Sequence, residues 1–110
     1  MKIIAVTACT TGIAHTYMAA DKLRQAAADA GITLKIETQG AMDQKLTLTQ
    51  EEIDMADLVL IATDVSIKRE ERFSASHRLT YPIQDVIQDP NKVLADAIAH
   101  VKKHKHGFNH

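Results

Sequence analysis

The chain is poor in cysteine and aromatic residues: its 110 residues include one Cys, no Trp, two Tyr and two Phe. A lone cysteine excludes an internal disulfide, and so few aromatic side chains do not suit a surface that stacks bases. The 13 Lys and Arg against 14 Asp and Glu give a formal net charge of -1, which predicts no basic field for nucleic acid. No apolar run approaches the roughly 20 residues of a membrane span, and no signal peptide is recognisable. These absences predict a protein of the reducing cytoplasm with no membrane segment of its own and no nucleic-acid partner.

The remaining composition is typical of a folded domain. Hydrophobic residues make up 45 % and charged residues 25 %, and the length is sufficient for one domain with a core. We expect this domain to span residues 1–103. The His-rich segment 104–110 is expected to be a disordered tail. Its His104 and His106 have no Cys or carboxylate close by, so neither a metal site nor a cofactor is predicted.

Four short segments have the composition of β-strands. Residues 2–8 and 57–63 are apolar and rich in β-branched side chains, which predicts buried strands. Residues 33–38 alternate between polar and apolar side chains, as a second strand would. Residues 78–83 predict a fourth strand. Its Pro82 places that strand at a sheet edge or ends it, because proline cannot donate to a strand ladder.

Helical signals lie between these strands. From about His15 until Gly31, a natural helix stop, apolar residues recur at steps of three and four: Tyr17, Ala20, Leu23, Ala27 and Ala30. Thr49 followed by Glu52 predicts a capping box that opens a short helix. An Asp-Pro pair at 89–90 predicts the start of a last helix. One apolar stripe follows on that helix: Val93, Leu94, Ala97, Ile98 and Val101.

This alternation predicts an α/β fold. We expect a single small domain with a mainly parallel four-stranded central sheet and helices on both faces, a Rossmann-like three-layer arrangement. Ligand sites in such folds lie at the carboxyl ends of the strands. Cys9 follows the first predicted strand, Gln39 and Gly40 follow the second, and Asp64 follows the third. These four residues are therefore expected at one edge of the sheet.

The stretch CTTGIAHT places the only cysteine, Cys9, between a strand end and a helix start. The first backbone N–H groups of a helix lack intrahelical partners and carry partial positive charge, which makes an anion site. Gly12 lets the backbone curl around an anion, and Thr10, Thr11 and Thr16 add hydroxyl donors. The same field favours a thiolate. The stretch predicts a nucleophilic cysteine at a phosphoryl cradle, and the alternative is a buried structural cysteine.

Two other thiol chemistries fit less well. Gly12 stands where a Cys-x-x-Cys motif would have its second cysteine, which excludes a redox pair. A cysteine phosphatase would have an arginine at position 15, where this chain has His15. Arginine would clamp the phosphoryl group with two donors and a permanent charge, whereas histidine offers at most one donor and a variable charge. Such a loop holds a phosphoryl group better than it drives hydrolysis, and a phosphoryl carrier needs that property.

The segment AVTACTTGIAHTYMAADKL resembles the active-site segment of the fructose-family IIB components of the bacterial phosphotransferase system. The similarity continues through KIETQG (35–40), LTLTQEEIDMADLVLIATD (46–64) and ERF (71–73), and so covers roughly residues 2–102. The resemblance implies that Cys9 accepts a phosphoryl group from the phosphohistidine of a IIA protein or domain. It implies transfer from there to a fructose-like sugar bound to the membrane IIC transporter during uptake. A phosphotransferase of the bacterial cytoplasm, peripheral to the inner membrane through IIC, is expected.

The resemblance also implies residue roles. Cys9 would be the nucleophile, and the cradle would comprise Thr10, Thr11, Gly12, Ile13, Ala14, His15 and Thr16.

Outside the cradle, Gln39, Gly40, Asp64, Arg72 and Phe73 would support the site or dock a partner. The alternatives are a plain turn at 39–40, and a solvated Arg72 with Phe73 in the core. Because like charges repel, we expect Asp64 to point away from a phosphocysteine, to cap the next turn, or to pair with Arg72. Met18 is expected in the core.

Three departures from the family pattern leave the sugar open. Thr10 stands where proline is common, Asp43 replaces a glycine, and SAS at 74–76 replaces a small-Lys pair. Two other functions also remain open. One is a regulatory module in which phosphorylation of Cys9 is a signal to a partner, and the other is a small cysteine-dependent phosphatase.

Overall fold

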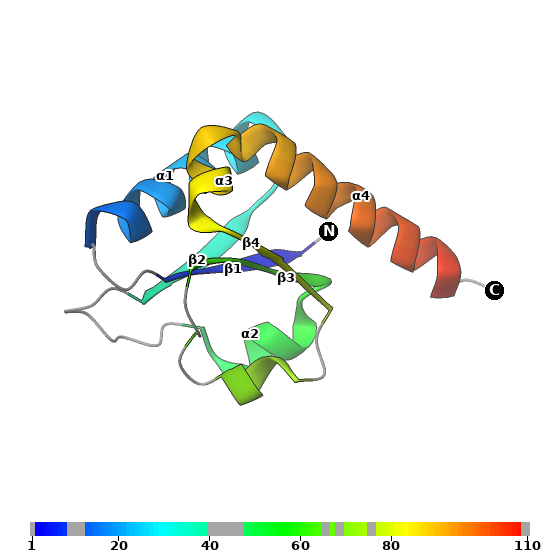
Figure 1. Cartoon of the computed structure of the whole chain (residues 1–110). Coiled ribbons are helices and arrows are strands. Elements are labelled where there is room, and N and C mark those ends of the chain that lie inside the picture. Colours follow the sequence, from blue (N-terminus) through cyan, green and yellow to red (C-terminus); the bar gives the residue numbers. More distant parts are fainter. Residues whose placement is uncertain are drawn as a thin grey trace.

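The chain alternates strands and helices along most of its length (Figure 1). The computed structural model describes residues 2–8, 13–39, 48–64, 67, 70–74 and 77–108. The elements in chain order are β1 (Ile3–Ala8), α1 (Ile13–Asp29), β2 (Leu34–Gln39), α2 (Gln50–Met55), β3 (Leu58–Thr63), the 3-10 helix η1 (Glu70–Phe73), β4 (Arg78–Tyr81), α3 (Ile83–Gln88) and α4 (Pro90–Phe108).

The four strands form one parallel sheet in the order β2-β1-β3-β4. The strand β1 lies in the middle, and all six of its residues are buried. The strand β4 lies at an edge and ends directly before Pro82, as the sequence predicts. The predicted α/β fold with a parallel central sheet is therefore confirmed.

Helices cover both faces of this sheet. Figure 1 shows α1, α3 and α4 on one side of the strands and α2 with η1 on the other. Odd-numbered residues of β1, such as Ile3 and Ala5, face the first group of helices, and even-numbered ones, such as Ile4 and Val6, face the second. The three layers follow from this alternation, because every strand residue of β1 is apolar or small on both faces.

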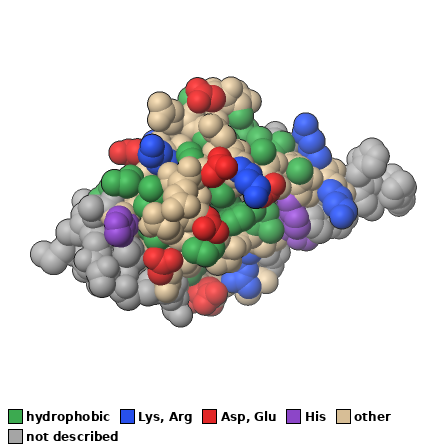
Figure 2. All heavy atoms as spheres, turned by 45° about the horizontal axis from the view of Figure 1, so that its top comes forward, with side chains coloured by type: hydrophobic (Ala, Val, Ile, Leu, Met, Phe, Trp, Pro, Cys, Tyr) green, Lys and Arg blue, Asp and Glu red, His purple; other side chains and the backbone are tan. Residues whose placement is uncertain are grey.

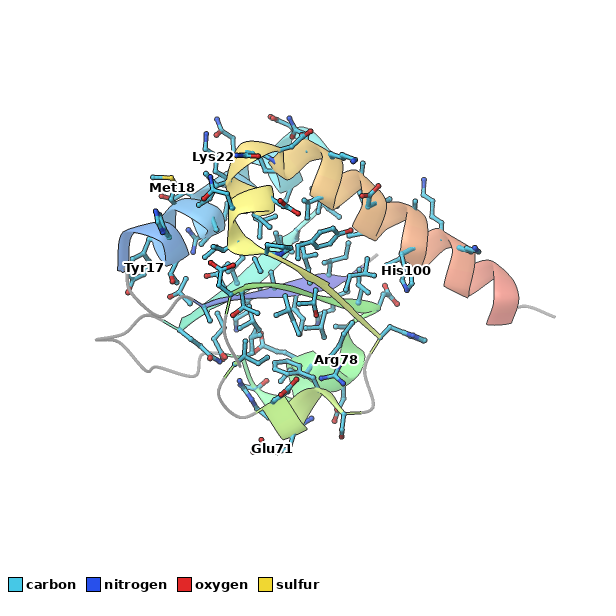
Figure 3. All side chains as sticks on the ribbon, in the orientation of Figure 1. Tyr17, Met18, Lys22, Glu71, Arg78 and His100 are labelled. Carbon is cyan, nitrogen blue, oxygen red and sulfur yellow. The ribbon has the colours of Figure 1, made fainter. Side chains whose placement is uncertain are left out.

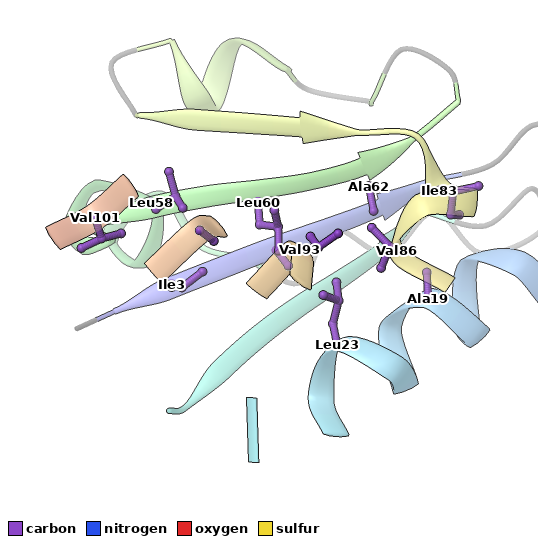
Figure 4. Close-up of a cluster of buried hydrophobic side chains, with 12 residues drawn as sticks. Ile3, Ala19, Leu23, Leu58, Leu60, Ala62, Ile83, Val86, Val93 and Val101 are labelled. Carbon is purple, nitrogen blue, oxygen red and sulfur yellow. The ribbon is translucent and has the colours of Figure 1, made fainter. Parts of the chain in front are cut away.

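The larger apolar cluster lies between the sheet and α1, α3 and α4, and Figure 4 shows it in close-up. It contains Ile3, Ala5, Ala19, Leu23, Leu58, Leu60, Ala62, Ile83, Val86, Val93, Ala97 and Val101. A second cluster lies on the α2 face and contains Ile4, Val6, Ala8, Leu48, Ile53, Val59, Ile61, Ile67 and Phe73. The apolar stripe predicted for the last helix faces the core, with Ile98 partly buried.

The predicted helix signals are confirmed where the structure describes them. The Thr49 hydroxyl accepts a hydrogen bond from the Glu52 backbone N–H, and the Glu52 carboxylate accepts one from the Thr49 backbone N–H, which completes the capping box. The Asp89 side chain accepts a hydrogen bond from the Lys92 backbone N–H at 3.2 Å and so caps α4. Gly31 has φ 74 directly after α1, a conformation that favours glycine.

Two elements differ from the sequence prediction. The segment predicted as a strand over 78–83 ends at Tyr81, and Ile83–Gln88 forms the helix α3. Apolar β-branched side chains favoured a strand there, but packing of Ile83 and Val86 against the core outweighs that propensity. The residues 104–108, predicted to be part of a disordered tail, continue α4 to Phe108. A helix already nucleated by a packed stripe propagates at little cost, which accounts for the extension.

Candidate functional site at the carboxyl edge of the sheet

Three strands end level with one another at the carboxyl edge of the sheet. Ala8 of β1 pairs with Gln39 of β2 on one side and with Thr63 of β3 on the other. Cys9 is the next residue of the chain after Ala8. The backbone register therefore places the ends of these three strands at one edge, and Cys9 follows one of them in the sequence.

Part of the predicted cradle lies outside the described residues, namely Cys9, Thr10, Thr11 and Gly12. Gly40, predicted to support the site, lies outside them too. The structure describes the chain on both sides of residues 9–12, since β1 ends at Ala8 and α1 begins at Ile13.

The first turn of α1 contains Ile13, Ala14 and His15, and it has no acidic residue. Figure 1 shows this end of α1 on the same side of the molecule as the carboxyl ends of β1 and β2. Unpaired N–H groups and the helix dipole concentrate partial positive charge there. His15 is exposed to solvent. An anion held just beyond Ala8 would face the start of a helix.

Thr7 and Thr16 connect the strand end to this helix. The Thr7 hydroxyl donates a hydrogen bond to the Thr16 carbonyl at 3.1 Å, and both residues are fully buried. The Thr16 hydroxyl oxygen, in contrast, has no hydrogen-bond partner among the residues that the structure describes. Helical side chains tilt toward the N-terminus of their helix, so this hydroxyl lies on the side of the cradle. A buried polar group without a partner is rare in proteins and calls for a physical reason.

Glu37 and Arg72 form a buried ion pair near the same edge. The side chain of Glu37 is 0 % exposed and that of Arg72 is 7 % exposed. Arg72 donates through Nη2 to Oε2 of Glu37 at 2.8 Å and through Nη1 to Oε1 at 3.1 Å. This two-pronged contact is the strongest geometry available to an arginine and a carboxylate.

Two further donors complete the surroundings of the Glu37 carboxylate. The Leu48 backbone N–H donates to Oε1 at 3.0 Å, and Gln39 Nε2 donates to Oε2 at 2.9 Å. Burial by itself would raise the pKa of Glu37, but the hydrogen bonds from Arg72, Leu48 and Gln39 outweigh it and hold that pKa below its ordinary value. Glu37 is therefore a carboxylate inside the protein.

The structure shows the surroundings of Arg72 and Phe73. Arg72 pairs with Glu37 and not with Asp64, and it is not solvated. Phe73 is fully buried in the second apolar cluster, with the Arg72 guanidinium carbon 4.9 Å from the centre of its ring. Phe73 in the core agrees with the alternative given above, and its burial leaves no surface with which to dock a partner.

Asp64 binds the start of α3, which follows η1 and β4 in the chain and is not the turn directly after Asp64. Its Oδ1 accepts a hydrogen bond from the Ile83 backbone N–H at 3.2 Å, at the start of α3. Asp64 also lines an open hollow of about 670 Å³ beside the ends of β3 and β4, whose described lining is Ile61, Thr63, Asp64, Ile67, Glu70, Thr80 and Pro82.

Met18 and Tyr17 differ from the sequence prediction. Met18, expected in the core, is 44 % exposed, and Tyr17, part of the predicted apolar stripe, is 36 % exposed. The buried stripe of α1 is instead formed by Ala19, Ala20, Leu23, Ala26 and Ala27. Figure 3 shows Met18 and Lys22 side by side on α1, and Figure 2 shows apolar side chains beside a histidine at this end of the molecule. The helix faces the core with small side chains, which allows it to pack close to the sheet.

Sequence reasoning missed Glu37, although it lies within the quoted segment KIETQG. The polar side chains of β2 alternate with apolar ones, and such a pattern normally indicates a solvated face. A signal was present in the sequence: Lys35, Glu37 and Gln39 share one face of a strand whose sheet was predicted to be covered on both sides. In the structure Lys35 pairs with Glu52 of α2, and Glu37 pairs with Arg72 of η1.

Neither a metal centre nor a membrane helix is found in the described part of the chain. No group of three or more His, Cys, Asp or Glu is placed there to hold a metal ion. No helix of these residues combines the length and the apolar character needed to cross a membrane.

Comparison with known proteins identifies the family. The profile described as PTS system, Lactose/Cellobiose specific IIB subunit matches residues 4–96. The PTS system fructose-like EIIB component 2 of Escherichia coli K12 is 42 % identical over 100 residues, which cover 91 % of this chain and 94 % of the relative. The PTS system fructose-specific EIIABC component of Bacillus subtilis is 41 % identical over 97 residues, covering 88 % of this chain and 15 % of that longer protein.

Solved structures agree with this. The solution structure of the Enzyme IIB subunit of the PTS system from Escherichia coli K12 superimposes with a TM-score of 0.86 at 34 % identity, covering 94 % of this chain and 96 % of that one. A lactose-specific IIB domain from Streptococcus pneumoniae has a TM-score of 0.52 at 14 % identity, covering 91 % and 98 %, and shares the fold alone. The chain therefore belongs to the IIB family of the phosphotransferase system and is similar to its fructose-type components.

Proposed function

We propose that this protein carries a phosphoryl group on Cys9. In the first step the Cys9 thiolate attacks the phosphorus of a phosphohistidine on a IIA protein or domain. The S–P bond forms as the P–N bond breaks, and the imidazole leaves neutral after taking up a proton. In the second step a hydroxyl of a sugar bound by a membrane IIC transporter attacks the same phosphorus. The thiolate is restored, and the hydroxyl proton passes to a base or to water.

One observation in the structure carries this proposal: the buried Thr16 hydroxyl at the start of α1 has no partner among the described residues. An unpaired buried hydroxyl costs about 1–3 kcal/mol. A phosphoryl group on Cys9, at the N-terminal end of α1, would accept a hydrogen bond from this hydroxyl and remove that cost when the carrier is loaded. Backbone N–H groups of Ile13, Ala14 and His15 would stabilise the same anion.

The relatives support the choice of partners and sugar. A relative named EIIABC combines the letters A, B and C in one protein, and another named EIIB'BC combines B and C. These names support IIA as donor and IIC as acceptor complex. Relatives at 41–42 % identity are named fructose-like or fructose-specific, whereas the lactose-specific domain is only 14 % identical. A fructose-like sugar is therefore the proposed acceptor, with the protein working at the cytoplasmic face of the membrane through IIC.

The test is phosphoryl transfer to the purified protein. We would mix it with phosphoenolpyruvate, the general phosphotransferase proteins and a fructose-type IIA, and detect phosphocysteine by phosphorus NMR and intact mass. Cys9→Ser is the control that must lose the signal. The matched pair Thr16→Val and Thr16→Ser tests the cradle, since valine keeps the shape without the hydroxyl and serine keeps the hydroxyl.

The outcomes separate the functions left open by the sequence. A thiophosphate signal that Cys9→Ser abolishes, weaker in Thr16→Val than in Thr16→Ser, supports the proposal. Phosphocysteine that never passes to a sugar in IIC membranes would favour the regulatory module. Rapid release of inorganic phosphate from an aryl phosphate would favour the phosphatase. No transfer from several active IIA donors would refute the proposal.

A further inference from the structure

We infer that Glu37 and Arg72 are positioning residues for phosphoryl transfer: their buried pair fixes the strand end beside Cys9 relative to the elements that cover it. This inference rests on the proposed function and adds two residues that act on the reaction without touching the phosphoryl group.

The location of Glu37 is the first reason. It pairs with Val6 in the parallel ladder, and two residues further along the same strands Gln39 pairs with Ala8, directly before Cys9. The Glu37 carboxylate also restrains the Gln39 side chain, because the Gln39 amide nitrogen donates a hydrogen bond to it at 2.9 Å. The hydrogen-bond network of Glu37 therefore extends to Gln39, the last residue of β2. The strand β2 lies next to β1, which leads into Cys9.

The second reason is that one carboxylate joins three parts of the chain. It binds Gln39 at the end of β2, the Leu48 backbone before α2, and Arg72 of η1. Arg72 adds a longer contact of 3.4 Å to the Leu48 carbonyl, and its own carbonyl accepts from Gln50 of α2 at 3.1 Å. The same carboxylate therefore holds Gln39, the last residue of β2, and Leu48, which lies shortly before α2 in the sequence.

The third reason is energetic. A buried ion pair is seldom more stable than well-packed apolar side chains of the same volume, because two charges must be removed from water. The neighbours of this pair, such as Phe73 and Leu48, are apolar core residues, so an apolar pair would suit the site as well. What the ion pair adds is a single defined arrangement of the edge. Misplacing a reacting group by about 1 Å can lower a rate by up to about 100-fold.

The test is the double variant Glu37→Gln/Arg72→Met. The amide introduced at position 37 still has an oxygen to accept from the Leu48 N–H, and both charges are removed together, so no unpaired charge is left buried. We expect the kcat of transfer from phospho-IIA to Cys9 to fall about tenfold or more. The KM for phospho-IIA should change less than twofold, because neither side chain is exposed enough to touch the donor.

The matched control uses the other ion pair of the same strand. Lys35 lies two residues before Glu37 on the same face and pairs with Glu52 of α2, farther from the carboxyl edge. The double variant Lys35→Met/Glu52→Gln also removes two charges between β2 and α2, and it is expected to keep the wild-type kcat. Arg72→Lys keeps the charge without the two-pronged contact. Its kcat should lie between those of the wild type and of Glu37→Gln/Arg72→Met.

A merely structural role predicts a different result. Wild-type kcat and KM in Glu37→Gln/Arg72→Met would overturn the inference, and so would a raised KM with unchanged kcat, which indicates docking. Should that variant fail to fold, Arg72→Lys decides, and a wild-type kcat in it would overturn the inference. A wild-type protein that accepts no phosphoryl group would instead refute the proposed function.

Discussion

Arg72→Met alone should destabilise the protein strongly. The Glu37 carboxylate is 0 % exposed, and the substitution removes both hydrogen bonds that Arg72 donates to it. The buried Glu37 carboxylate then keeps only the hydrogen bonds from two neutral donors, the Leu48 backbone N–H and the Gln39 amide. Breaking a buried pair by removing one partner typically costs about 3–5 kcal/mol. A domain of this size has roughly 5–15 kcal/mol of stability, so the variant is expected to fold but to be much easier to unfold.

The loss should depend on pH in a defined direction. In the wild type the pKa of Glu37 is lowered, since donors outweigh the effect of burial. Its contribution to stability is therefore present above the unfolded pKa of about 4.3 and is lost as the pH falls through the folded pKa. Without Arg72, burial should raise the folded pKa above the unfolded one, so that the variant loses stability as the pH rises. The difference between the two proteins should be largest near neutral pH and shrink toward pH 4.

Urea unfolding at several pH values between 4 and 8 measures this difference. Lys35→Met is the matched control: it removes a cation from the same strand face, but its ion pair is partly exposed to solvent and is expected to contribute little. A loss below about 1 kcal/mol for Arg72→Met at pH 7, or a loss that does not change with pH, would refute the buried charge pair.

Three smaller perturbations test other contacts. Thr7→Val removes the buried hydroxyl that donates to the Thr16 carbonyl and should cost about 1 kcal/mol in urea unfolding, and an unchanged midpoint would contradict that bond. Thr49→Ala removes the capping box of α2 and should cost about 0.5–2 kcal/mol by thermal unfolding, whereas Thr49→Ser should retain most of it. Gly31→Ala should cost about 1–2 kcal/mol because φ is 74, although no atom lies within 4 Å of the added carbon, and Gly31→Asn should cost less.

The elements with strong local signals could be predicted from the sequence. The strand β1 is apolar on both faces, and the Thr49–Glu52 pair and Asp89 fix two helix starts through local hydrogen bonds. Such signals depend on neighbouring residues only, so they survive in the fold. The helix α3 was missed because Ile83 and Val86 suit either a strand or a helix, and their contacts across the core decide.

The site was predictable in its placement but not in its contacts. The parallel sheet brings Gln39 and Thr63 level with Ala8, and strand order alone determines this. The partner of Arg72 could not be read in the same way, because Glu37 is 35 residues away in the sequence and Asp64 only eight. Pairing of charges at such a distance depends on which face of β2 is covered by η1, a consequence of tertiary packing.

The contacts at the carboxyl edge, apolar around β1 and charged around β2, suit the role proposed for Cys9. The strand before Cys9 is buried along its whole length and held by ladders on both sides, so its end is a fixed point. Its neighbour β2 is an edge strand with only one ladder, and edge strands are the less restrained part of a sheet. Directional hydrogen bonds from Arg72 and Leu48 to Glu37 restrain β2 where a second ladder is missing. Apolar contacts would hold β2 as tightly but would allow it to shift along its own direction. The four hydrogen bonds that the Glu37 carboxylate accepts fix β2 in one position.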